Sequence, residues 1–212
     1  MTSLPPGQGI WAIIPVKPLL TSKNRLAHLL SPAARAALIG DFLARMLAEL
    51  RQVAGLAEIL LVSSDPAVAA LARQFGARLL LEERPLGLNT AVAQAANLAA
   101  AQGAAGILVL PADLPFLCAA DVQGLLDRVT VEPMLVISSD GRDDGTNALL
   151  LNPPGDFTFQ YGPGSYRKHL HEAAARSMAC VVVQTPGLQF DLDTEKDWQV
   201  YHQRRFPCLK IA

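Results

Sequence analysis

The chain has 212 residues, 51% of them hydrophobic, and its 18 Lys and Arg against 19 Asp and Glu leave a net charge of −1. This length suits one domain with a substantial core, so we expect a single domain over residues 1–212. The balanced charge, and the lack of any apolar run near ~20 residues, argue against a protein that binds nucleic acid or a membrane.

Short apolar runs alternate along the chain with segments of helical spacing. Ser31-Pro32 and Asp65-Pro66 are typical helix starts, each a capping residue followed by proline in the first turn. Strands are predicted at residues 9–16, 58–64, 78–82, 106–110, 134–139, 146–152 and 179–185. Helices are predicted at residues 32–51, 66–76, 89–103 (capped by Asn89 or Thr90), 119–129, 165–177 and 194–205.

This alternation predicts the α/β class, with a sheet covered by helices on both faces. Ligands of such sheets bind beyond the carboxyl ends of the strands. Those ends carry Lys17, Ser63, Asp113 and, further along, Asp191. We therefore expect an active site at one edge of the sheet.

The cysteines Cys118, Cys180 and Cys208 are widely spaced and include no Cys-x-x-Cys pair. Neither a zinc site nor a disulfide framework is indicated. The first residues lack a charged segment followed by an apolar one, so no signal peptide is expected. Together these features predict a cytoplasmic protein.

Three cations, Lys17, Lys23 and Arg25, lie in the loop after the first strand. Clustered Lys and Arg suit a polyphosphate, because they donate charge-assisted hydrogen bonds to phosphate oxygens. The chain has neither Gly-x-Gly-x-x-Gly nor the P-loop pattern, so those two nucleotide sites are not supported. The same spacing also fits an ordinary solvated loop.

Asp113, Asp191 and Asp193 form a second candidate group. Carboxylates two residues apart in an extended segment point the same way, and hard oxygen donors beside phosphates suit magnesium. Simpler roles stay open. Asp193 or Thr194 could cap the last helix, and Asp113 could be a turn residue between two prolines.

A third group joins Thr146, at a strand start, to the turn Gly162-Pro163-Gly164 before Ser165. Glycines and a helix start let backbone N–H groups approach an anion. A glycine turn with a serine cap is an equally common explanation. The histidines His28, His169 and His171 lack metal-ligand spacing, and we expect them at the surface. No nucleophile motif supports covalent catalysis.

Five segments in order, "IIPVKPL…SKNRL", "LPADLP", "DGTNALLL", "YGPGS" and "FDLDT", resemble one family over nearly the whole chain. It is the 2-phospho-L-lactate / phosphoenolpyruvate guanylyltransferase family of deazaflavin coenzyme (F-420) biosynthesis. That family is similar in fold to the molybdenum-cofactor and sugar-phosphate nucleotidyltransferases. The resemblance implies a three-layer α/β/α domain with a mostly parallel mixed sheet, of the Rossmann-like nucleotide-diphospho-sugar transferase type.

The resemblance also implies a role for each candidate group. Asp113, Asp191 and Asp193 match the magnesium ligands. Lys17, Lys23 and Arg25 match the triphosphate contacts and, with Asp113, the catalytic set. Thr146, Gly162 and Ser165 match the positions that hold the acceptor, and Asn89 lies where this fold reads the nucleotide. Tyr161 departs from the family, in which phenylalanine is common before the GPGS turn.

The implied reaction is attack by a phosphomonoester oxygen on the α-phosphorus of GTP, with pyrophosphate leaving. Since the second pKa of a phosphomonoester is near ~6, the nucleophile is ionised at pH 7 and needs no histidine base. Phosphoenolpyruvate is the favoured acceptor; 2-phospho-L-lactate and 3-phospho-D-glycerate are alternatives. The product would pass to the next transferase of the pathway. The exposed face of the 165–176 helix and residues 206–212 could mediate a homodimer.

Three other functions remain at this stage. Asp191-Leu192-Asp193 is the Asp-x-Asp pattern of GT-A glycosyltransferases, although that motif normally follows a mid-chain strand. A cytidylyl- or sugar-phosphate transferase of the same fold would carry a glycine-rich first loop. A regulatory module would bind GTP and magnesium without turnover.

Overall fold

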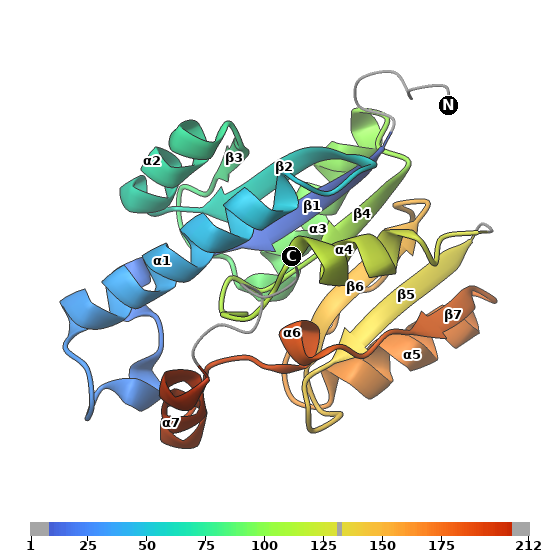
Figure 1. The fold of residues 1–212 in the computed structure, drawn as a ribbon. Helices are drawn as coiled ribbons and strands as arrows, with labels where there is room; N and C mark the ends of the chain where they lie inside the picture. Colours follow the sequence, from blue (N-terminus) through green and yellow to red (C-terminus); the bar gives the residue numbers. More distant parts are fainter. Residues whose placement is uncertain (1–8, 131–132, 205–212) are drawn as a thin grey trace.

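The computed structural model describes residues 9–130 and 133–204. Its strands form one sheet of seven in the order β3-β2-β1-β4-β6-β5-β7 (Figure 1). The strands are β1 (Ile10–Pro15), β2 (Leu56–Ser63), β3 (Arg78–Leu81), β4 (Gly106–Val109), β5 (Met134–Ser139), β6 (Thr146–Asn152) and β7 (Ala179–Val182). All seven strands were predicted, with ends that differ by a few residues.

The sheet is parallel except at β6. Strand β1 pairs in parallel with β2 and β4, and β2 pairs in parallel with β3. Strand β6 is inserted antiparallel between β4 and β5, and β5 is parallel to β7. The start of β6 therefore lies at the same edge as the carboxyl ends of the other strands, which confirms the mostly parallel mixed sheet.

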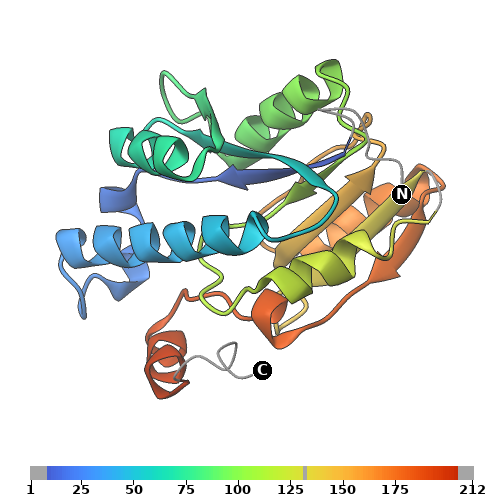
Figure 2. The same cartoon turned by 45° about the horizontal axis from the view of Figure 1, so that its top comes forward.

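Helices cover both faces of the sheet (Figures 1 and 2). One buried cluster joins the sheet to α1, α2, α4 and α6, and the other joins it to α3 and α5, which confirms three layers. No described helix has the length and apolar character needed to cross a membrane. The helices are α1 (Pro32–Leu50), α2 (Pro66–Phe75), α3 (Leu88–Ala101), α4 (Ala119–Leu126), α5 (Ser165–Ala175), α6 (Pro186–Gln189) and α7 (Glu195–Gln203).

The helix starts follow the capping rules at most positions. Ser31 Oγ accepts from the Ala34 N–H at 3.2 Å, and Asp65 Oδ1 accepts from the Ala67 N–H at 2.8 Å. The predicted cap of α3 is wrong: Gly87, with φ 93°, precedes the helix, and neither Asn89 nor Thr90 caps it. Glycine is favoured at this position because the chain enters the helix through a positive φ, which residues with side chains rarely adopt.

The last part of the chain contains an element that was not predicted. Helix α6 begins after Thr185, whose Oγ1 accepts from the Leu188 N–H at 3.3 Å, so β7 ends earlier than expected. Helix α7 is capped by Thr194, which leaves the Asp193 carboxylate available for other contacts. The predicted helix to 205 runs past the described residues, as do Cys208 and the 206–212 segment. Neither Cys118 nor Cys180 forms a disulfide among the described residues.

Candidate active site

The loop after β1 is held in shape by two residues outside it. The buried guanidinium of Arg35, on α1, donates to the carbonyls of Ser22 at 3.0 Å and Leu30 at 2.9 Å. The Asp65 carboxylate accepts from the Leu19 N–H at 2.7 Å. Within the loop, backbone hydrogen bonds form the 3₁₀ turns Leu19–Thr21 and Asn24–Leu26, between which Lys23 adopts a left-handed φ of 53°. The loop therefore has a conformation fixed by tertiary hydrogen bonds, and it is not an ordinary solvated loop.

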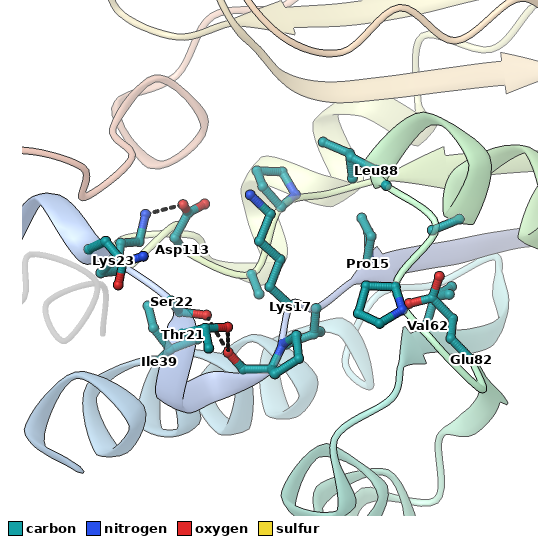
Figure 3. Close-up of a pocket in the computed structure, with 18 of the residues that line it drawn as sticks. Pro15, Lys17, Thr21, Ser22, Lys23, Ile39, Val62, Glu82, Leu88 and Asp113 are labelled. Atoms are coloured by element: carbon teal, nitrogen blue, oxygen red, sulfur yellow. Dashed lines mark hydrogen bonds and ion pairs between the residues drawn. The ribbon is translucent and has the colours of Figure 1, made fainter. Parts of the chain in front are cut away.

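Lys23 lies between two of the predicted carboxylates. Its Nζ forms ion pairs with Asp113, drawn in Figure 3, and with Asp193 Oδ1 at 2.6 Å. The Lys23 side chain is only 8% exposed. Burial alone would lower the pKa of this amine, but the charges of Asp113 and Asp193 outweigh burial and raise it. Lys23 is therefore charged and offsets the two carboxylates.

The three aspartates share one electrostatic environment. Burial, and then repulsion by Asp113 and Asp193, raises the pKa of Asp191 to about 6. Burial acts in the same direction on Asp193, but Lys23 and then Arg25 overcome it and lower the pKa of that carboxyl. Arg25 NH1 lies 3.8 Å from Asp193 Oδ2. The sheet edge thus gathers more negative charge than Lys23 balances.

The donor set suits a divalent cation. The Asp113 Oδ1 atom is buried and has no hydrogen-bond partner among the described residues, and an anionic Asp191 is disfavoured by its neighbours. Hard oxygen ligands with unbalanced charge fit magnesium. Within residues 9–130 and 133–204, however, no three acidic, His or Cys side chains are already arranged around a common metal position. Since the Lys23 ammonium lies between Asp113 and Asp193, it would have to move for an ion to enter.

Lys23, Asp113 and Asp193 line a cavity of about 790 Å³, whereas Asp191 is not part of its lining. This volume is typical of small-molecule sites. In Figure 3, Lys23 and Asp113 lie at one side of it, Val62, Glu82 and Leu88 at the other, and Lys17 extends between them. The cavity brings together the predicted residues Lys17, Lys23, Arg25, Asp113 and Asp193. Ser63 is not part of it, because the Ser63 hydroxyl donates to the Val16 carbonyl at 2.8 Å and joins β2 to the end of β1.

Thr146 and Ser165 form a second group at the same edge of the sheet. The buried Ser165 hydroxyl donates to Thr146 Oγ1 at 3.2 Å. Asp144, in the loop before β6, accepts from the Gly164 N–H at 3.0 Å and fixes the glycine turn against that loop. Gly162 has a φ of 125°, which side-chain-bearing residues rarely adopt. The structure thus joins Thr146, Gly162 and Ser165, as predicted.

The surface position expected for His169 is wrong. Its side chain is fully buried, with Nδ1 3.0 Å from Thr146 Oγ1 and Nε2 accepting from the Gln160 N–H at 2.9 Å. Burial lowers the His169 pKa to about 4. A signal was present in the sequence, because Ser165, His169 and Ala173 recur every four residues along one helix face. His28 and His171 are exposed, as expected.

Asn89 does not line the cavity, but it connects the cavity wall at the start of α3 to the glycine turn before Ser165. Its side-chain amide pairs with the backbone of Tyr161: Oδ1 accepts from the N–H at 2.6 Å, and Nδ2 donates to the carbonyl at 3.2 Å. Asn89 follows Gly87 and Leu88, which form part of the cavity wall. The nucleotide contact expected of Asn89 stays a prediction, and its observed role is to tie α3 to the turn before Ser165.

Residues 10–201 match the family model described as "Guanylyl transferase CofC like". This chain belongs to that family. It is 44% identical over 188 residues to a phosphoenolpyruvate guanylyltransferase of Rubrobacter xylanophilus, covering 89% of this chain and 91% of that protein. It is 37% identical over 201 residues to a 3-phospho-D-glycerate guanylyltransferase of Phenylobacterium zucineum, covering 93% and 90%.

A 2-phospho-L-lactate guanylyltransferase of Methanothermobacter thermautotrophicus is 31% identical over 186 residues, covering 88% of this chain and 81% of that protein. Among solved structures, a protein of the nucleotide-diphospho-sugar transferase type from Desulfovibrio desulfuricans superposes with a TM-score of 0.75 at 14% identity, covering 97% and 91% of the two chains. That likeness confirms the predicted fold. The family membership makes the protein a guanylyltransferase and removes the glycosyltransferase and regulatory alternatives.

Proposed function

We propose that this guanylyltransferase transfers GMP from GTP to the phosphate of a small phospho-acid, with phosphoenolpyruvate as the favoured acceptor. The observation that carries the proposal is the meeting of two sites at one sheet edge. The cavity with Lys17, Lys23, Arg25 and Asp113 suits a triphosphate, and the Thr146–Ser165 pair beside the glycine turn suits a small anion.

An oxygen of the acceptor phosphate is the nucleophile. It is largely ionised at pH 7, so the enzyme needs no general base. His169 agrees with this, because both ring nitrogens are engaged and burial lowers its pKa to about 4. The task of the site is then to bring two anions together, and Lys17, Lys23 and Arg25 offset their repulsion.

Magnesium is the expected ion, held by Asp113, Asp191 and Asp193. When bound, it would neutralise charge on the phosphates of GTP and on the leaving pyrophosphate. Lys23, which now pairs with Asp113 and Asp193, would be released toward the phosphates. The unpartnered Asp113 Oδ1 and the raised pKa of Asp191 support this arrangement.

The guanylylated product is an activated acid for a following transferase, which we place in deazaflavin coenzyme biosynthesis in the cytoplasm. A dimer through the exposed face of α5 is part of the same proposal. The relatives named above act, by their names, on three different phospho-acids. The acceptor must therefore be identified by experiment.

The experiment measures pyrophosphate release from GTP and magnesium with phosphoenolpyruvate, 2-phospho-L-lactate or 3-phospho-D-glycerate, each supplied alone. We expect the fastest release with phosphoenolpyruvate. Reactions with ATP or CTP in place of GTP, and reactions without acceptor, are the controls. Faster pyrophosphate release with another of the three acids would identify that acid as the acceptor in place of phosphoenolpyruvate. No release with any of them would refute the proposed function.

A further inference from the structure

His169 has a fixed pattern of protons. Its Nε2 accepts a hydrogen bond from the Gln160 backbone N–H at 2.9 Å. A backbone N–H can only donate, so Nε2 carries no proton and the ring is neutral. The one ring proton is therefore on Nδ1, and it points at Thr146 Oγ1, 3.0 Å away. Thr146 receives a hydrogen bond from the histidine and cannot give one to it.

The hydroxyls of Thr146 and Ser165 then carry one more proton than the hydrogen bonds within the network can use. Thr146 and Ser165 share a single hydrogen bond, in which Ser165 Oγ donates to Thr146 Oγ1 at 3.2 Å. That bond uses one of the two hydroxyl protons, and the histidine side accepts neither. Within the described residues, neither hydroxyl has a further partner. One hydroxyl proton is thus left to donate out of the network, and an anionic oxygen is its strongest acceptor.

The surroundings hold the ring in this state. The His169 ring packs edge-on against Tyr161, with centroids 4.8 Å apart, and lies 5.9 Å from the Phe157 ring. The side chain is fully buried, and burial lowers its pKa to about 4, so it stays neutral at pH 7. The other tautomer would take a proton from Thr146, and a flipped ring would turn carbon atoms toward Thr146 and Gln160. Either change would leave the Gln160 N–H without an acceptor.

We propose that His169 is a positioning residue that makes the Thr146–Ser165 pair a hydrogen-bond donor of fixed direction toward an anionic oxygen of the acceptor. This inference rests on the proposed function, since it places the acceptor beside Thr146. The donor is neutral, so it selects an anion by hydrogen bonding without adding charge near the metal and triphosphate. A carboxylate or a phosphate oxygen of the phospho-acid could be the partner.

The first test is the tautomer itself, in the wild-type protein without ligand. Long-range ¹H–¹⁵N correlation spectra of the histidine rings distinguish Nδ1–H from Nε2–H, and comparison with His169→Gln assigns the signal. We expect Nδ1–H, unchanged between pH 6 and pH 8. The Nε2–H tautomer, or a protonated ring at pH 7, would overturn the inference.

The second test compares two substitutions that differ in hydrogen bonding. His169→Leu removes both contacts, whereas His169→Gln offers an oxygen to the Gln160 N–H and an N–H to Thr146. Loss of a directed hydrogen bond predicts about a tenfold rise in the acceptor KM for His169→Leu, with a GTP KM changed less than about twofold. His169→Gln should recover most of the loss. His171→Leu, an exposed position on the same helix, is the matched control.

Equal rises in both KM values, or no rescue by glutamine, would overturn the positioning role. If His169→Leu does not fold, the tautomer measured in the wild-type protein still decides the inference, because an Nε2–H ring would accept the Thr146 proton and leave the pair without a surplus donor. Isopropyl phosphate, which is 2-phospho-L-lactate with a methyl group in place of the carboxylate, distinguishes the two partners. Equal inhibition of wild type and His169→Leu assigns the donor to the carboxylate, and weaker inhibition of the variant assigns it to the phosphate.

The two proposals fail in different ways. A wild-type enzyme that releases no pyrophosphate with any phospho-acid refutes the proposed function, and with it the role of His169 toward the acceptor. An active wild-type enzyme whose His169→Leu variant keeps the wild-type acceptor KM refutes only the inference about His169.

Discussion

The two halves of the site are held together by different forces. Around Lys23, the contacts are ion pairs with Asp113 and Asp193, and Asp191 adds a carboxylate that burial and its neighbours disfavour. Around His169, the contacts are neutral hydrogen bonds among fully buried or nearly fully buried side chains. The first region has unbalanced charge and an unpartnered oxygen on Asp113, whereas the second has a complete set of partners on the histidine.

This difference separates a part of the site that must rearrange from a part that is already formed. Charges that compensate one another change partners when a stronger cation or anion arrives, since their energies depend on the ions present. Buried neutral networks keep one geometry, because breaking any bond leaves an unsatisfied group. We therefore expect substitutions near Lys23 to affect turnover and substitutions near His169 to affect acceptor binding and stability.

The largest effect is expected from Asp113→Ala. Loss of this carboxylate removes a predicted magnesium ligand, and we expect kcat to fall by at least about a thousandfold. Lys23 keeps its pair with Asp193, so the thermal unfolding temperature should change little. Activity assays and thermal melts measured together test this pair of outcomes. A variant that keeps substantial activity would remove Asp113 from the metal site.

The neutral region predicts a pH dependence of stability. The pKa of His169 is about 4 in the folded chain, against 6.5 for an ordinary histidine, so the unfolded chain binds a proton that the folded chain does not. The contribution of neutral His169 to the unfolding free energy is fully present above pH 6.5 and is lost as the pH falls toward 4. The loss amounts to about 3 kcal/mol.

Urea unfolding at several pH values measures this effect. His169→Gln is the control, because it removes the titrating group and keeps hydrogen bonds available. The unfolding free energy of the wild type, relative to that of the variant, should fall as the pH is lowered from 6.5 to 4 and should stay constant above pH 6.5. A difference that is the same at every pH would mean that His169 does not titrate as its burial indicates.

A smaller effect is expected from Ser165→Ala. The substitution removes the hydroxyl that donates to Thr146, and we expect about a tenfold rise in the acceptor KM with little change in the GTP KM. Steady-state kinetics with each substrate varied in turn measure the two values. If both KM values rise together, Ser165 does not belong to the acceptor site.

The smallest effect is expected from Tyr161→Phe. The Tyr161 hydroxyl is buried and has no hydrogen-bond partner among the described residues, so its burial costs free energy that phenylalanine would not pay. We expect the unfolding free energy to rise by up to about 1 kcal/mol, with activity retained. A loss of acceptor affinity in this variant would instead show that the hydroxyl contacts the acceptor.

Local patterns predicted much of this molecule. The alternation of apolar strands and amphipathic helices determined the α/β class, and Ser31 and Asp65 marked two helix starts correctly. Of the two candidates for the cap of the last helix, Asp193 and Thr194, the structure selects Thr194. The position of Lys17, Lys23 and Asp113 just after buried strands placed them at one edge of the sheet. The capping rule failed at α3, where Gly87 precedes the helix in place of Asn89 or Thr90. The start of α6 was not predicted, although Thr185-Pro186 repeats the pattern of a capping residue followed by proline.

The sequence by itself determined which residues reach the sheet edge, since strand ends and loops follow from local periodicity. Only the tertiary structure decided their partners. Lys23 meets Asp113 and Asp193 across 90 and 170 residues of chain, and His169 meets Thr146 because β6 runs antiparallel between β4 and β5. Periodicity reports the average burial of an element, whereas strand order and direction determine which side chains face one another.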